Sequence, residues 1–123
     1  MDFNKVIDYV KLCLLEKYAD FSGRASRGEY WSFALTASVI TGVLNSLGRN
    51  SNVLSIIAYL VSLAVLLPNI AVAVRRLHDI GKKGTWYLLA LIPIVGWVIL
   101  IIWFCKEGDP GENEYGVNPL EVD

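Results

Sequence analysis

Long apolar runs alternate with short polar segments along this chain, and the runs predict three membrane-spanning helices at residues 31–47, 53–74 and 86–104. The second run supplies roughly 22 residues, which at about 1.5 Å per residue is enough to cross a hydrocarbon core about 30 Å thick. Tyr30 and Trp31 begin the first run, and such aromatic residues favour the headgroup level of a membrane. The pattern therefore predicts an all-α membrane protein.

Residues 1–20 differ from these runs because apolar and charged positions alternate there at helical spacing. The apolar residues recur every three or four positions, whereas lysines and acidic residues occupy the opposite face. A segment this charged is not expected to cross the membrane. We expect an amphipathic helix that lies in the membrane interface or packs on the cytoplasmic ends of the other helices.

The third run, residues 86–104, is broken at Pro93–Gly96 by residues that interrupt helices. Aromatic residues stand at both of its ends, with Trp86 at the first and Trp103 at the second. Two such belts favour a kinked but complete crossing. The alternative is a re-entrant hairpin that enters and leaves the membrane on one side, which would also place the tail on that side.

Small and weakly polar side chains are expected where helices pack against each other in the membrane. Ala34, Ser38 and Gly42 recur every four residues of the first run and form one small-residue face. Ser62 and Asn69 lie seven residues apart in the second run and share a face that should contact protein rather than lipid. These five residues are the predicted helix-packing positions.

Pro68 interrupts the backbone hydrogen bonding of the second run. Because proline has no N–H, the carbonyl group of Ala64 loses its helical donor, and a kink is expected there. Asn69, the adjacent polar side chain, is a candidate partner for the freed group.

The composition fits a single membrane domain covering residues 1–123, with 54% hydrophobic residues and a mean hydropathy of +0.46. We divide it into the amphipathic helix (1–20), a membrane core (21–104) and a polar, acidic tail (105–123). The net charge of −1 gives no basic surplus of the kind that nucleic-acid binding requires. Glycines and prolines in the tail predict turns rather than a calcium loop, because the acidic spacing of an EF-hand is missing.

Positive charges give the expected orientation of the chain. With three crossings and a cytoplasmic N-terminus, Arg49 and Lys106 are the only two of the eleven Lys and Arg residues that lie outside. Segments rich in lysine and arginine stay on the cytoplasmic side of the membrane. The bias therefore predicts that the N-terminus is cytoplasmic.

The polar segment Val74–Trp86, between the second and third runs, contains the only histidine, His78, next to Asp79. A proton-transfer pair is the catalytic interpretation of these two residues. However, side chains at adjacent helical positions point about 100° apart, and no nucleophile accompanies them. Cys13 and Cys105 have no CxxC spacing and no companion histidines, which disfavours a metal site. We therefore expect no catalytic residue, no metal and no cofactor, and an enzymatic role is disfavoured.

Charged residues before the first run and after the second should meet at one membrane face, because the turn at residues 48–52 is short. We call their predicted assembly the basic collar. A guanidinium group matches the geometry of phosphate, and each basic residue near an anionic leaflet contributes about 1 kcal/mol. The hypothesis is that the collar binds anionic lipid or a partner and locks the helices together. Its members are Arg24, Arg27, Arg75, Arg76, His78 and Asp79.

Four stretches of the chain carry recognisable motifs, namely Phe21–Trp31, Arg75–Gly81, Ile92–Trp97 and Gly108–Pro119. Taken together and in order, they resemble a small bacterial inner-membrane family catalogued as domain of unknown function 805. The resemblance extends over nearly the whole chain, although Asp109 stands where the family pattern commonly has Thr. It implies an all-helical protein of the bacterial inner membrane and brings no activity with it.

Two classes of function follow from these features. The first is a non-enzymatic binding or scaffold protein, or an accessory subunit, whose basic collar contacts membrane lipids, above all anionic ones. The second is a small transporter or channel unit that assembles as a homo-oligomer or with another membrane protein. Nucleic acid is not an expected partner in either class.

Overall fold

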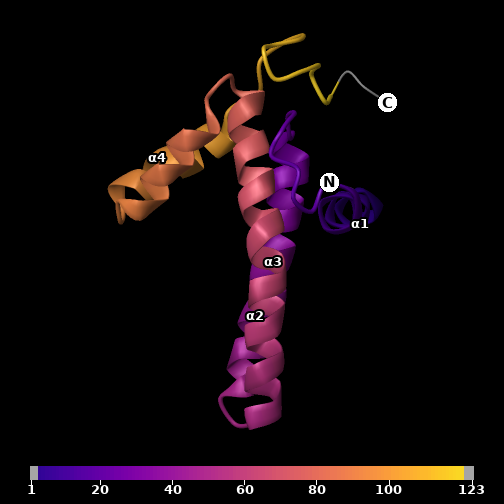
Figure 1. The fold of residues 1–123 in the computed structure, drawn as a ribbon, viewed down its shortest axis with the longest axis vertical. Helices are drawn as coiled ribbons and strands as arrows, with labels where there is room; N and C mark the ends of the chain where they lie inside the picture. Colours follow the sequence, from indigo (N-terminus) through magenta and orange to yellow (C-terminus); the bar gives the residue numbers. More distant parts are fainter. Residues whose placement is uncertain (1–2, 121–123) are drawn as a thin grey trace.

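Two long antiparallel helices dominate the structure, a computed structural model that describes residues 3–120 (Figure 1). This part of the chain is built from α-helices, a π-helical turn and a 3-10 segment, and it contains no named β-strand. In chain order the elements are α1 (Phe3–Lys11), η1 (Leu12–Glu16), α2 (Arg27–Gly48), α3 (Asn52–Asp79), η2 (Gly84–Leu91) and α4 (Val95–Cys105). The predicted all-helical class is confirmed.

Among the residues that the structure describes, α2 and α3 are the two helices long and apolar enough to cross a membrane. A serine immediately before each helix caps its N-terminus, Ser26 for α2 and Ser51 for α3. The side-chain oxygen of each serine accepts a hydrogen bond from a backbone N–H three residues later. They correspond to the first two apolar runs. α3 continues past Val74 to Asp79, so the predicted polar hinge begins as helix.

Polar groups lie inside this structure and many apolar groups lie outside. Arg75 and Arg76 have no exposed surface, whereas Leu91 is 78% exposed and Ile94 is 70% exposed. A water-soluble protein would expose its arginines and bury most of its large apolar side chains. The distribution instead suits a protein surrounded by hydrocarbon, in which charged side chains face the protein interior.

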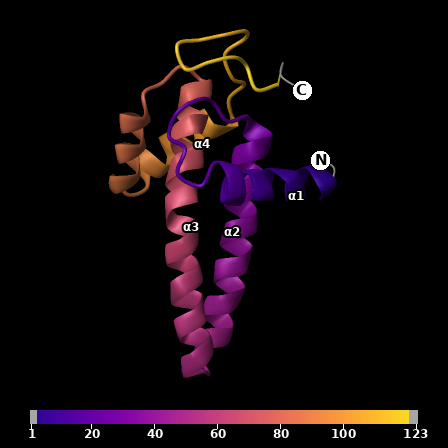
Figure 2. The same ribbon diagram turned by 45° about the vertical axis from the view of Figure 1, so that its right-hand side comes forward.

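Helix α1 lies across the α2–α3 hairpin rather than along it, as Figure 2 shows. Val10 and Cys13 pack against Phe33 of α2 and Val72 of α3. At the start of the same segment, the side chain of Phe3 remains 73% exposed. A crosswise amphipathic helix with apolar side chains on its outer surface fits the predicted place in the membrane interface.

Pro68 lies inside α3, and the helix continues through it. The carbonyl oxygen of Ala64, which loses its helical donor because of Pro68, accepts a hydrogen bond from the hydroxyl group of Tyr18. Tyr18 therefore takes the role for which the sequence suggested Asn69. The bond also ties the segment after η1 to α3.

We expect Tyr18→Phe to lower the free energy of unfolding by about 1 to 3 kcal/mol, because it leaves the Ala64 carbonyl group without a donor. Pro68→Ala restores a helical N–H, so Tyr18→Phe should have a much smaller effect in that background. Denaturant unfolding in detergent micelles can compare the four proteins of this double-mutant cycle. Equal effects of Tyr18→Phe in both backgrounds would contradict the assigned bond.

The third apolar run folds back on itself instead of crossing as one kinked helix. Elements η2 and α4 form a hairpin on the side of α3 away from α1 (Figures 1 and 2). Gly84, at the start of this hairpin, lies against Val74 of α3, and the carbonyl oxygen of Cys105, at its end, accepts a hydrogen bond from Arg27. Both ends therefore lie at the same end of the α2–α3 hairpin. The predicted third crossing is not confirmed, because the run has the hairpin shape of the re-entrant alternative, while its place relative to the membrane stays a prediction.

The break at Pro93–Gly96 is a complete turn rather than a kink. The N–H of Val95 donates to the carbonyl oxygen of Pro93 at 2.8 Å, and Ile94 between them has a φ of 67°. This tight turn reverses the chain between η2 and α4. The tail consequently begins at the end of the molecule where α2 starts.

The small-residue face predicted on α2 is not the surface that contacts α3 within this chain. Phe33 and Ala37 of α2 form the buried cluster with Val72 of α3, whereas Ser38 and Gly42 are exposed. The internal face combines one large side chain, Phe33, with small alanines such as Ala37 and Ala71. Ala34, Ser62 and Asn69 are partly buried. Contact of the Ser38 and Gly42 side with lipid or another chain stays a prediction.

Candidate functional site

Three buried arginines and two buried carboxylates gather where α2, α3, α4 and the tail meet. We call this set, Arg24, Arg75, Arg76, Glu29 and Asp79, the arginine lock. The arginine side chains have no exposed surface, and the carboxylate side chains are 5% exposed. An unpaired charge at such depth would cost several kcal/mol, so the pairing within the set determines whether this region can fold.

Asp79 pairs with two arginines from different segments. Its Oδ1 atom lies 2.9 Å from Nε of Arg24, and its Oδ2 atom lies 2.7 Å from Nη1 of Arg76. Arg76 stands one helical turn earlier on α3, whereas Arg24 belongs to the loop that precedes α2. One carboxylate therefore connects that loop to the end of α3.

Arg75 makes a separate ion pair with Glu29 in the first turn of α2. Its Nε atom also donates to the carbonyl oxygen of Asp20 at 3.1 Å, and its Nη2 atom lies 3.9 Å from Sγ of Cys13. Burial, together with the negative charge of Glu29, raises the pKa of the Cys13 thiol to about 11. Cys13 is therefore a neutral packing residue near pH 7 rather than a reactive thiolate.

The C-terminal end of α4 is capped by donors from α2 and α3. The last carbonyl groups of a helix lack internal partners and form the negative end of its dipole. The carbonyl oxygen of Phe104 accepts from Nε of Arg76 at 3.1 Å and from the indole N–H of Trp31 at 3.2 Å. Arg27 donates to the next carbonyl oxygen, that of Cys105, at 3.3 Å. These donors hold the re-entrant hairpin against α2 and α3.

Arg24 holds the tail through three backbone carbonyl oxygens. Its guanidinium group donates to Asp109 at 2.6 Å, to Gly111 at 2.7 Å and to Gly116 at 3.2 Å. The tail returns a hydrogen bond, because the N–H of Asp109 donates to the carbonyl oxygen of Asp79 at 2.7 Å. The tail is thus attached to the same two residues that form the first ion pair.

Gly108 passes directly over the carboxylate of Asp79. A Cβ atom at this position would lie 2.1 Å from Oδ2 of Asp79, so any larger residue would displace the tail or the carboxylate. Asn113 secures the same region, since its Nδ2 atom donates to the carbonyl oxygen of His78 at 2.9 Å and to Oδ2 of Asp109 at 3.0 Å. The close approach explains a glycine at the start of the tail motif.

His78 has a structural position beside the lock. Its Nδ1 atom lies 2.9 Å from the carbonyl oxygen of Gly23, which can only accept, so Nδ1 carries a proton. Its ring stacks parallel to that of Tyr115, with the centroids 3.9 Å apart. Within residues 3–120, no group of three or more His, Cys, Asp or Glu side chains is placed to hold a metal ion. His78 therefore joins α3 to the loop and the tail.

The structure brings all six members of the predicted basic collar to one end of the molecule. Five of them are buried, and of the six only Arg27 is exposed. The guanidinium groups of Arg24, Arg75 and Arg76 are directed at carboxylates and backbone carbonyls of this chain. The basic residues with exposed side chains at this end include Arg27, Lys83 and Lys106, together with Lys5 and Lys11 of α1.

Two features of the site were not predicted from the sequence. Trp31 was interpreted only as a membrane-boundary residue, yet its indole N–H caps α4. The tail was expected to form independent turns, yet its backbone carbonyls complete the coordination of Arg24. Backbone acceptors have no side-chain signature. The sequence does contain one indication of this arrangement. The three arginines of the lock have too few carboxylates nearby in sequence to pair with, and the glycine-rich tail can bring backbone carbonyls close to them.

The fold and the arginine lock together define an all-helical protein with two candidate membrane spans, in which a long hairpin, a shorter hairpin and a tail are joined by buried ion pairs. The chain belongs to the family described as protein of unknown function DUF805, whose model matches residues 18–117. It is 41% identical over 109 residues to inner membrane protein YhaI of Escherichia coli K12, which covers 88% of this chain and 92% of the relative. Inner membrane protein YhaH of the same strain is 41% identical over 113 residues, with 88% and 93% covered. No solved structure matches the chain.

Proposed function

We propose that the protein is a non-enzymatic binding or scaffold component of the bacterial inner membrane, with its N-terminus and its tail on the cytoplasmic side. The observation that carries the proposal is the use of the arginine lock: its donors join the loop before α2, the end of α3, the end of α4 and the tail. Side chains committed in this way hold a platform together rather than act on a substrate. The inner-membrane location rests on the relatives named above.

The orientation is supported by the distribution of positive charge over this fold. Because η2 and α4 fold back, Lys106 lies at the same end as the lock, and Arg49 is the one residue of the eleven Lys and Arg at the opposite turn. The bias is stronger than three crossings would give. By the positive-inside rule, the end with the lock is cytoplasmic.

Cys105 provides a direct test of this orientation. It is exposed, whereas Cys13 is buried and has a raised pKa, so a thiol reagent reports on Cys105. We expect a membrane-impermeant maleimide to label Cys105 in inverted membrane vesicles and not in intact spheroplasts. In a Cys105→Ser background, Arg49→Cys should show the opposite pattern. Labelling of Cys105 from outside would contradict the proposed side of the tail.

The exposed basic residues Arg27, Lys83 and Lys106 are proposed to contact anionic headgroups. Each such residue contributes about 1 kcal/mol, so replacing Lys83 and Lys106 by Gln should weaken retention of anionic lipid by about thirtyfold while the fold is kept. Arg27 is left unchanged in this variant because it also donates to the carbonyl group of Cys105. Lipid that co-purifies from mixed anionic and zwitterionic nanodiscs measures the effect. Arg49→Gln at the opposite turn is the matched control. If the double variant keeps as much anionic lipid as wild type, this contact surface is not used.

The alternative function is an oligomeric transporter or channel unit. It is favoured by the exposure of Ser38, Gly42 and Asn45 on α2, where small and polar side chains could be covered by another copy. Ion flux in liposomes that is abolished by Asn69→Leu would support this alternative. A stable protein partner that co-purifies without flux would support the scaffold.

A further inference from the structure

A cavity of about 810 Å³ lies between the N-terminal segment and the tail. Its lining includes Tyr9 and Leu12 from α1 and η1, and Val117 and Pro119 from the tail. Because α1 lies across the hairpin, the cavity is at the level where an interfacial helix meets lipid headgroups (Figure 2). It therefore combines apolar walls with access to the membrane interface.

Two opposite charges in this cavity are not committed to the fold. Arg24 and Glu29 also line it, but each is already paired within the arginine lock. Glu16 and Lys17 remain, and neither forms a salt bridge with another residue that the structure describes, although Lys17 lies within electrostatic reach of Asp20. The lining is therefore neutral as a whole, with a carboxylate and an ammonium group that form no salt bridge within the described chain. Such a pair complements a zwitterion better than it complements an anion.

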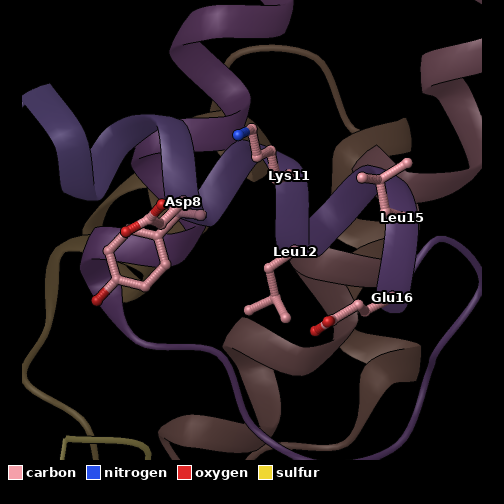
Figure 3. A pocket seen from close by; sticks show the side chains of 6 residues that line it. Asp8, Lys11, Leu12, Leu15 and Glu16 are labelled. Carbon is pink, nitrogen blue, oxygen red and sulfur yellow. The ribbon is translucent and has the colours of Figure 1, made fainter.

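A second hollow, of about 430 Å³, adjoins this cavity at the junction of α1 and η1 (Figure 3). Leu12 and Glu16 line both spaces, and Figure 3 shows their side chains pointing into the hollow from neighbouring turns. Leu15 also lines the hollow and is 78% exposed. Leu12 and Leu15 thus form an apolar strip that continues from the charged cavity, with Asp8 and Lys11 beside it in the same lining. Acyl chains that follow a headgroup can lie along such a strip.

We infer that the cavity binds the headgroup of a phosphoethanolamine lipid, whose acyl chains run along Leu12 and Leu15. The primary ammonium group of the lipid donates to the Glu16 carboxylate, and its phosphate accepts from the Lys17 ammonium group. A choline headgroup has no N–H to donate to Glu16, and a glycerol headgroup brings no cation to it. This site is separate from the exposed arginine and lysines of the proposed function, so either can fail without the other.

Native mass spectrometry of the full chain in detergent tests the inference with phosphatidylethanolamine, phosphatidylcholine and phosphatidylglycerol of identical acyl chains. Wild type should bind the ethanolamine lipid about tenfold more tightly than the other two, the effect of one charge-assisted hydrogen bond. Glu16→Gln should abolish this preference, and Lys17→Gln should weaken all three lipids. Exposed residues outside the cavity provide the controls, Glu107→Gln and Lys5→Gln, which should change neither result.

Glu16 and Lys17 form no salt bridge in the described part of the chain, so Glu16→Gln and Lys17→Gln should unfold at the same temperature as wild type. Equal binding of the three lipids by wild type, or an unchanged preference in Glu16→Gln, would overturn the inference. Soluble glycerophosphoethanolamine separates a lipid from a soluble ligand of the same chemistry. It should compete only weakly, because it lacks the acyl chains; competition at the same concentration as the lipid would overturn the lipid assignment.

Discussion

Asp79→Asn is expected to lower the free energy of unfolding by about 3 to 5 kcal/mol, the usual effect of removing one partner from a buried ion pair. The change preserves the size of the side chain and removes its charge. Arg24 and Arg76 would then remain buried beside a neutral amide, and the amide N–H₂ group would face their donors. Denaturant unfolding in detergent micelles measures the loss.

The same substitution should release the tail. Arg24 is held between Asp79 and the tail carbonyls, so loss of the carboxylate loosens both ends of this connection. We expect trypsin to cleave after Lys106 at least about tenfold faster in Asp79→Asn than in wild type. Asp8→Asn, the same change at an exposed position of α1, is the control for both measurements. Wild-type stability together with a protected Lys106 would show that Asp79 does not join α3 to the tail.

The sequence was sufficient for the elements that depend on periodicity. α2 and α3 follow from long apolar runs, and the crosswise α1 follows from its apolar and charged faces. The charged residues at one end were also expected to meet, since a short turn joins the two helices. These inferences use only local spacing and the hydrophobic effect, which act within one segment at a time.

The arrangement inside the site needed information from distant segments. The collar residues were expected to bind anionic lipid or a partner, whereas Arg24 and Arg76 are buried because Asp79 lies between them and backbone carbonyls surround them. The bond from Tyr18 to the Ala64 carbonyl group likewise joins segments 46 positions apart. No periodic pattern encodes such pairs, because the acceptor is often the backbone.

The path of the third apolar run was also undetermined by composition. A run flanked by aromatic residues is compatible with a crossing or a hairpin, and the residues at its break permit either a kink or a reversal. What favours the reversal in the structure is the end of α4, where Arg27, Trp31 and Arg76 supply donors to its last carbonyl groups. A complete crossing would place these carbonyls on the other side of the membrane, away from their donors.

Gly96→Ala should disrupt the turn that reverses this run. A Cβ atom on Gly96 would lie 1.8 Å from the carbonyl oxygen of Leu89 and 2.8 Å from its carbonyl carbon. Both are backbone atoms, and the N–H of Ile92 donates to that same oxygen at 3.0 Å. The end of η2 therefore cannot move away from the added methyl group without breaking this hydrogen bond. We expect the free energy of unfolding to fall by about 3 kcal/mol, the upper part of the range for overpacking.

Gly42→Ala is the matched control, because Gly42 lies inside α2 and a Cβ atom there meets nothing within 4 Å. Alanine favours helix over glycine by about 0.5 to 1 kcal/mol, so this variant should be as stable as wild type or slightly more stable. Maleimide labelling of Cys105 reports on the position of the end of α4. In Gly96→Ala an opened turn would separate that end from Arg27 and change the labelling. If both alanine variants unfold like wild type and label alike, the start of α4 does not pack on Leu89, and the re-entrant hairpin loses its structural basis.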